Sequence, residues 1–192
     1  IIWLLAGSHE LSELNHPDWG SYLVSLRTVT VPMFTAAETH RLLTEPLRHS
    51  PLWAQDDPQR PRFGEALWGE GGIAWLHDQA GGWPHLVQLL AESAVDILND
   101  HGARQLTPAL QAETAARAVA RGEIVLRQLL ERECRLPGEW DYLAAFRLTE
   151  TQPPPADNAV RRSLKRRLLV TEEGDRWRLR VPLMHHWLRQ RG

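Results

Sequence analysis

Apolar residues recur at helical spacing in the stretch from Trp83 to Asn99. Polar residues hold the opposite face, and Pro84 stands where the first turn of a helix tolerates proline. Two glycines, Gly81 and Gly82, interrupt the preceding pattern. The pattern predicts an amphipathic helix that begins at about Trp83 and buries one side. The stripe comprises Leu86, Leu90, Ala94 and Ile97.

Short apolar or β-branched runs precede this helix. Residues 1–6 and 25–31 predict two strands, separated by enough chain for a helical crossover. Two parallel strands alone do not make a stable sheet. We therefore expect the chain to be a fragment that begins inside a strand, with further strands upstream.

Helix signals follow in order along the chain. Thr35 and Glu38 have the spacing of a capping box for a helix from Ala36 to about Glu45. Residues 49–72 are rich in Pro, Asp and Gly and predict a loop with one short helix. Further helices are expected over 73–79, 108–119 and 123–134, with Thr107 as a cap and Gly102 as a left-handed helix end. Together these segments predict a helical bundle.

The last third of the chain changes character. A helix is expected over 137–147, and Asp157 is expected to cap another over 158–169. Two β-like runs then flank Gly174 and Asp175, which predicts a hairpin with its turn at 173–176. Pro182 opens a final helix.

Two segments resemble a known family. The Gly-Gly-x-Pro turn followed by a Leu-Gln-Leu-Leu helix resembles the lid of signal-transduction ATPases of the AAA+ superfamily, called STAND NTPases. The ending Arg-Leu-Arg-Val-Pro-Leu-x-x-x-Trp-Leu-Arg is similar to the C-terminal winged helix of bacterial STAND ATPases. The resemblance implies a mainly α fold: remnant P-loop α/β core strands over 1–46, a helical lid over 47–134 and a winged-helix domain over 135–192.

The resemblance also implies binding residues. Ser8 follows the first predicted strand, as the sensor 1 residue does, and Gly82 and Pro84 match the lid motif that contacts the nucleotide. His185, within Met184-His185-His186, resembles the histidine that touches the β-phosphate of ADP. In an alternative register, the place directly before the closing helix is Val181, and the histidines lie one turn into that helix.

The family relation implies ATP or ADP with Mg²⁺ as cofactor, bound mainly by an upstream ATPase core. This chain has no G-x-x-x-x-G-K-[ST] motif and no apolar strand that ends in paired acids. We therefore expect no ATP hydrolysis by the chain alone. The implied function is a nucleotide-dependent switch that assembles into a homo-oligomer.

The uneven distribution of charge leaves alternative functions open. The net charge is −2, but residues 1–156 carry 12 Lys/Arg against 20 Asp/Glu, and residues 157–192 carry 10 against 4. A basic helix before a hairpin is typical of DNA-binding winged helices, so a DNA-binding regulator is one alternative. Docking of the same face on acidic parts of the protein, or a non-catalytic interaction scaffold, are others. The DNA-reading candidates are Arg161, Arg162, Lys165, Arg166 and Arg178.

Cysteine content and hydropathy suggest where the protein works. The single cysteine, Cys134, excludes an internal disulfide and a thiolate zinc cluster, and it is typical of a reducing cytosol. No apolar run reaches the roughly 18 residues of a membrane helix. We expect a cytoplasmic protein without a membrane partner or a metal site of its own.

Overall fold

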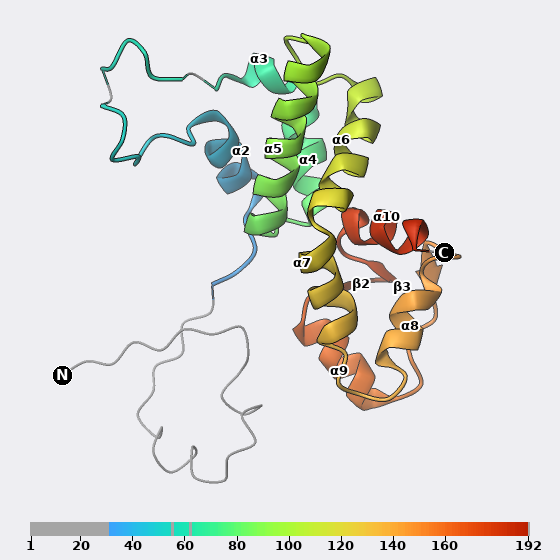
Figure 1. Cartoon of the computed structure of the whole chain (residues 1–192). Helices are drawn as coiled ribbons and strands as arrows, with labels where there is room; N and C mark the ends of the chain where they lie inside the picture. The colour runs from blue at the N-terminus through green and yellow to red at the C-terminus, as the bar shows by residue number, and fades with distance from the viewer. Residues whose placement is uncertain (1–30, 55, 62, 192) are drawn as a thin grey trace, which may run out of the picture. The chain divides into compact units, whose positions relative to one another are not determined.

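The structure is a computed structural model that describes residues 31–191, apart from residues 55 and 62. Chain contacts separate Ile1–Pro32 from Met33–Gly192, and every helix and strand of the described part belongs to the second unit. Ser8 and the two predicted strands lie outside the described residues, apart from Val31. The described part is mainly helical, with a small three-stranded antiparallel sheet, in agreement with the expected mainly α class (Figure 1).

Helix α5 (Pro84–His101) is the centre of the helical bundle (Figure 1). The four residues of its predicted stripe are fully buried, because α5 packs against α4 (Gly72–Ala80), α6 (Pro108–Arg121) and α2 (Ala36–Thr44). Its end is also as predicted, since Gly102 takes a left-handed φ of 59°. The sequence pattern therefore located the main core helix correctly.

Local capping defines α2, while a buried indole holds α3 (Glu65–Trp68). The Thr35 hydroxyl accepts a hydrogen bond from the Glu38 amide at 3.2 Å, and the Glu38 carboxylate accepts one from the Thr35 amide at 2.8 Å. This capping box confirms the prediction. Helix α3 is the short helix expected in the 49–72 loop. Its Trp68 is 2% exposed and donates its indole N–H to the Leu43 carbonyl at 3.2 Å.

The helix predicted over 123–134 changes form midway. It begins as α7 (Glu123–Arg127) and continues as the π-helix η2 (Gln128–Arg132). The Glu133 amide donates to the Gln128 carbonyl at 3.1 Å, one residue further back than in an α-helix. The Leu129 carbonyl is therefore left to accept from the Arg167 guanidinium. Thr107 likewise differs from expectation, because it occupies the N-cap of α6 without a side-chain capping bond.

The sheet contains one strand more than predicted. The hairpin of β2 (Val170–Glu173) and β3 (Arg176–Leu179) has the expected turn, with Glu173 opposite Arg176. The prediction of a hairpin alone is incomplete, because β1 (Thr151–Gln152) pairs with the other side of β3. A strand of two residues is too short for alternation to reveal it. The Arg176 side chain secures it by two hydrogen bonds to Thr151, at 2.8 and 2.7 Å.

Three helices complete the C-terminal region: α8 (Glu139–Ala145), α9 (Asn158–Arg166) and α10 (Pro182–Gln190). Asp157 caps α9 as predicted, because its carboxylate accepts from the Ala159 amide at 2.6 Å. Helix α9 ends three residues earlier than expected. Leu168 takes a left-handed φ of 53°, which turns Leu169 into the core at 1% exposure.

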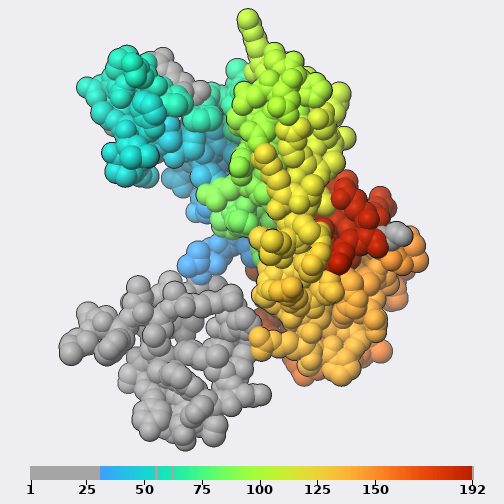
Figure 2. Space-filling model, in the orientation of Figure 1, coloured from blue at the N-terminus to red at the C-terminus, as the bar shows by residue number. Residues whose placement is uncertain are grey.

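The bundle and the C-terminal region share one core. Buried apolar residues from Leu43 in α2 to Leu188 in α10 form a continuous cluster. Helix α10 packs against α4, α6 and α7 as well as β3, and Figure 2 shows α10 in red beside α6 and α7 in yellow. Movement of the C-terminal region away from the bundle would therefore expose apolar surface.

Candidate functional site

The predicted Gly-x-Pro element forms the turn between α4 and α5. Gly81 and Gly82 both adopt left-handed conformations, with φ of 57° and 73°, which favour glycine. The Gly81 amide donates to the Asp78 carbonyl at 3.1 Å, and the Gly82 amide donates to the His77 carbonyl at 3.2 Å. Pro84 follows as the first residue of α5 and is half-buried. We call Gly81–Pro84 the glycine turn.

One side of the glycine turn touches the segment that leads into α2. The Phe34 amide donates to the Gly82 carbonyl at 2.8 Å. A Cβ atom on Gly82 would lie only 2.5 Å from the Phe34 carbonyl oxygen and 3.5 Å from the Cβ of Met33. Any side chain at this position would therefore push the Met33–Phe34 segment away.

The other side of the glycine turn touches the segment that joins β3 to α10. A Cβ atom on Gly81 would lie 2.9 Å from the Val181 side chain and 3.1 Å from the Arg180 carbonyl oxygen. Val181 is fully buried. The turn thus contacts two segments that lie at opposite ends of the described chain, and the absence of side chains permits both contacts.

Polar groups surround this turn. The His77 Nδ1 lies 2.8 Å from the hydroxyl of Thr39, which is fully buried, and the His77 ring also lies next to Gly82. The indole Nε1 of Trp83 and the side-chain carbonyl oxygen of Gln79 are buried, and neither has a hydrogen-bond partner among the described residues. A donor and an acceptor beside the turn are therefore unsatisfied, which costs free energy.

His185 lies in the second turn of α10, whose first residue is Pro182 and whose N-cap is Val181. This placement is that of the alternative register. Its Nε2 donates to the Phe146 carbonyl at 2.8 Å, because a carbonyl only accepts. Partial burial, with the neighbouring His185 and Arg189, lowers the pKa of His186. The structure thus fixes the His185 ring at the end of α8, and its phosphate role stays a prediction.

Acidic residues form ion pairs with two of the five predicted DNA-reading cations. The Lys165 ammonium lies 2.5 Å from the Glu172 carboxylate, and the Arg178 guanidinium lies 2.5 Å from that of Glu173. Hydrogen bonding from Lys165 lowers the pKa of Glu172. Arg161 donates to the Pro155 carbonyl. Arg162 and Arg166 lie exposed on α9.

Arg167, next to this set, has a structural role that the sequence did not reveal. Its guanidinium lies 2.8 Å from the carboxylate of Glu139, which is 1% exposed. The same carboxylate accepts from the Ser163 hydroxyl at 2.6 Å and from the amides of Arg135 and Leu136 at 3.1 and 3.4 Å. The pair thus joins η2, α8 and α9. In the sequence Arg167 is one cation within a basic run, so no local pattern distinguishes it.

Burial reduces the reactivity of the single cysteine. Cys134 is half-buried and donates its thiol to the Leu130 carbonyl at 2.9 Å. Burial raises the pKa of its thiol, although the nearby Arg167 lowers it. The cysteine is therefore protonated near neutral pH, which is unfavourable for a nucleophile.

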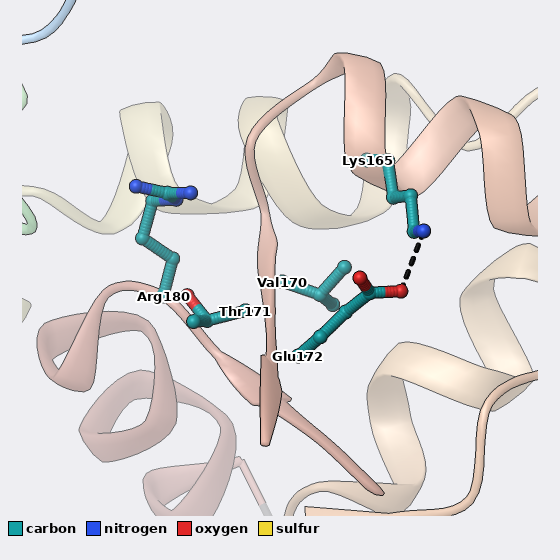
Figure 3. A pocket seen from close by; sticks show the side chains of 5 residues that line it. All are labelled: Lys165, Val170, Thr171, Glu172 and Arg180. Carbon is teal, nitrogen blue, oxygen red and sulfur yellow. Dashed lines mark ion pairs between the residues drawn. The ribbon is translucent and has the colours of Figure 1, made fainter. Parts of the chain in front are cut away.

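A surface hollow lies between the end of α9 and the sheet (Figure 3). Its volume is about 220 Å³, and its lining comprises Lys165, Val170, Thr171, Glu172 and Arg180. The Nε of Arg180 is buried without a hydrogen-bond partner. Arg180 directly follows β3, and no sequence pattern separates it from Arg176 and Arg178, both of which bond to neighbours.

Comparison with known proteins gives no family for the chain. A scan against protein-family models found no match, and searches of curated proteins and of solved structures found none either. Among the described residues, no three His, Cys, Asp or Glu side chains are grouped to hold a metal ion. No helix in the described part has the length and hydropathy to cross a membrane.

Proposed function

We propose that this chain is the sensor, lid and winged-helix portion of a nucleotide-dependent switch of the STAND/AAA+ type. The observation that carries the proposal is the double contact of the glycine turn. Gly82 contacts Phe34, on the segment that follows residues 1–32, and Gly81 contacts Arg180 and Val181, which lead into α10. A ligand that displaces this turn would affect both segments together.

The order of elements supports the same assignment. A helical bundle around the glycine turn precedes a helix, a short strand, a helix, a hairpin and a closing helix. This second set has the composition of a winged helix in which the middle helix is missing. The shared core supports a closed arrangement, because opening it would expose buried apolar residues of α10 such as Met184 and Trp187.

The turn has features that suit a nucleotide base. Pro84 offers a half-buried apolar ring, and the unsatisfied Trp83 Nε1 and Gln79 carbonyl oxygen, both buried, would supply one donor and one acceptor if the turn moved. A base edge presents both kinds of group. Gly82 and Pro84 would pack near the base, and Ser8 would sense the γ-phosphate. The phosphate cradle and the Mg²⁺ ligands are assigned to an ATPase core that precedes this chain.

In this proposal the switch works in the cytoplasm and assembles into a homo-oligomer after nucleotide exchange. A nucleotide shifts the equilibrium between closed and open forms only through its difference in affinity for the two. His185 is a weaker part of the proposal, because its Nε2 already bonds to the Phe146 carbonyl. A phosphate contact by Nε2 would require that bond to break.

DNA binding is the less supported alternative. Two of its five candidate cations are ion-paired, and Arg161 is engaged by a backbone carbonyl. Exposed ion pairs are weak enough to exchange for phosphate, so Lys165 and Arg178 stay candidates beside Arg162 and Arg166, which lie exposed on α9.

Nucleotide content of the longer protein, with about 150 further upstream residues, tests the proposal. The protein is purified without added nucleotide and denatured, and the supernatant is chromatographed. We expect stoichiometric ADP or ATP, which Pro84→Ala should remove or strongly reduce. Pro108→Ala is the matched control, because Pro108 occupies the same first helical position in α6 but is exposed. A nucleotide-free protein that retains duplex DNA, and loses it when Arg162 and Arg166 become Glu, would favour the regulator.

A further inference from the structure

Two arginines of the C-terminal region have opposite surroundings. Arg167 is paired with buried Glu139, whereas the side chain of Arg180 forms no hydrogen bond or ion pair within the described residues. The Nε of Arg180 is nevertheless buried. A buried donor without a partner is unfavourable unless another group satisfies it. Arg180 is therefore the cation of this region that has most to gain from an anionic ligand.

The hollow beside Arg180 offers further donors. Figure 3 shows Arg180 and Thr171 on one side of strand β2, and Glu172 and Lys165 on the other side; all four line the hollow. The Thr171 hydroxyl makes no hydrogen bond within the described residues. Glu172 is tied to Lys165 at 2.5 Å, but both side chains are about half exposed, at 54% and 51%. Such an exposed pair is weak, so Lys165, whose ammonium also lies 5.4 Å from the centre of the Trp177 ring, can exchange the pair for a second anion.

We propose that this hollow binds a phosphate-type oxyanion, with Arg180 as the main ligand and Lys165 and Thr171 as additional donors. The arginine fork matches two oxygens of a phosphate group. Donors from both sides of β2 suit a tetrahedral group, which presents oxygens in several directions. A planar carboxylate has only two oxygens, and one guanidinium occupies both. A volume of about 220 Å³ has room for pyrophosphate.

This inference goes beyond the proposed switch and does not depend on it. The hollow is lined by α9 and the hairpin, and none of its lining residues belongs to the glycine turn. Arg180 links the two places through its backbone, since its carbonyl oxygen lies against Gly81. A bound oxyanion would therefore immobilise the β3–α10 segment next to the turn.

Calorimetric titration of the chain with pyrophosphate at fixed ionic strength tests the site. We expect saturable binding that Arg180→Met weakens about 10- to 100-fold, the usual effect of losing hydrogen bonds to a charged group. Arg180→Lys should lie between the two, because it keeps the charge and loses the fork. Arg162→Met is the matched control: Arg162 is exposed on α9, does not line the hollow, and should change affinity by less than about twofold.

Melting of the variants separates binding from folding. Arg180→Met removes no pairing within the described residues, so its melting temperature without ligand should not fall. Pyrophosphate should raise the melting temperature of the wild type and of Arg162→Met but not of Arg180→Met. A wild type without saturable pyrophosphate binding, or an equal loss in both methionine variants, would overturn the proposal.

Competition experiments identify the class of anion that the hollow binds. Malonate that binds as tightly as pyrophosphate, with the same dependence on Arg180, would overturn the phosphate assignment. ADP that displaces pyrophosphate, with adenosine inactive, would support the polyphosphate of a nucleotide as source; pyrophosphate binding indifferent to ADP would support a free phosphate. The chain could also bind ADP but not pyrophosphate, with ADP binding unchanged in Arg180→Met. That result would refute this site and would not contradict the proposed nucleotide switch.

Discussion

The helical bundle and the C-terminal region are stabilised by different kinds of contact. In the bundle, α5 contributes a stripe of fully buried apolar residues to its neighbours. In the C-terminal region, the carboxylate of Glu139 is buried and accepts four hydrogen bonds, including one from Arg167. The spacing of apolar residues reveals the first arrangement in the sequence, whereas the second depends on residues that meet only in the fold. Regions of the first kind are therefore easier to predict.

The largest effect is expected where the buried charge loses its partner. Glu139→Ala leaves Arg167, only 14% exposed, without its carboxylate and removes the acceptor of the Arg135 amide. We expect a loss of about 3–5 kcal/mol in the free energy of unfolding, measured by urea denaturation.

A double variant sharpens this result. Replacing Glu139 and Arg167 together by methionine removes both charges, so it should cost less than Glu139→Ala alone. A double variant that is as unstable as Glu139→Ala would contradict the view that the unpaired Arg167 charge causes most of the loss.

The apolar stripe of α5 gives the next largest effect. Leu90 is fully buried at its middle, and Leu90→Ala should cost about 2–5 kcal/mol through lost burial and a cavity. Gln88→Ala on the exposed face of the same helix is the control and should stay within about 0.5 kcal/mol in urea denaturation. Equal effects at the two positions would contradict the placement of the stripe.

The glycine turn offers a smaller, matched comparison. Gly82 and Gly102 both have left-handed φ angles, but only Gly82 has a backbone oxygen 2.5 Å from the Cβ position. Gly102→Ala should cost about 1 kcal/mol, the ordinary penalty for a left-handed alanine. Gly82→Ala should cost about 1–3 kcal/mol in the same urea assay, because Phe34 must also move. An equal loss of unfolding free energy in the two variants would mean that the Met33–Phe34 segment moves away from residue 82 without a measurable penalty.

The smallest effect is expected in the dependence of stability on pH. Burial raises the pKa of Glu123, but hydrogen bonds from Trp187 and Arg127 outweigh it and lower the pKa below the ordinary 4.5. The resulting stability is fully present above that ordinary value and is lost as the pH falls through the folded-state pKa. Glu123 and Arg127 are partly exposed, so the contribution should stay below about 1 kcal/mol.

Melting curves between about pH 6 and pH 3 measure this contribution. Glu123→Gln should flatten the acid limb of the melting temperature against pH. Arg127→Met should act in the same direction, since it removes one cause of the lowered pKa. An unchanged acid limb in both variants would contradict the assignment.

Local sequence patterns predict most of the described fold, and the elements that they do not predict have physical causes. Capping residues, paired glycines and the α5 stripe act within a few residues, so Thr35, Asp157 and Gly102 were placed correctly. Strand β1 and the π-helix depend on partners far along the chain, namely β3 and Arg167. Leu168 takes an unfavourable φ to bury Leu169, which no local preference indicates.

The candidate sites divide in the same way. Gly82 and Pro84 were found because their motif is local, and the structure places them in a turn with two contacts. Arg180 is a candidate because its buried Nε has no hydrogen-bond partner among the described residues. The surroundings of this side chain are set by the fold, and no local sequence pattern indicates them. Ser8 lies outside the described residues and stays a prediction.

Hydrogen exchange on the longer protein tests the central claim most directly. The Phe34 amide bonds to Gly82, and the Arg180 amide bonds to Leu169. If the glycine turn responds to nucleotide, replacing ADP by a non-hydrolysable ATP analogue should change the exchange of both amides together. Nucleotide binding that leaves both amides unchanged, or changes only one of them, would contradict the account.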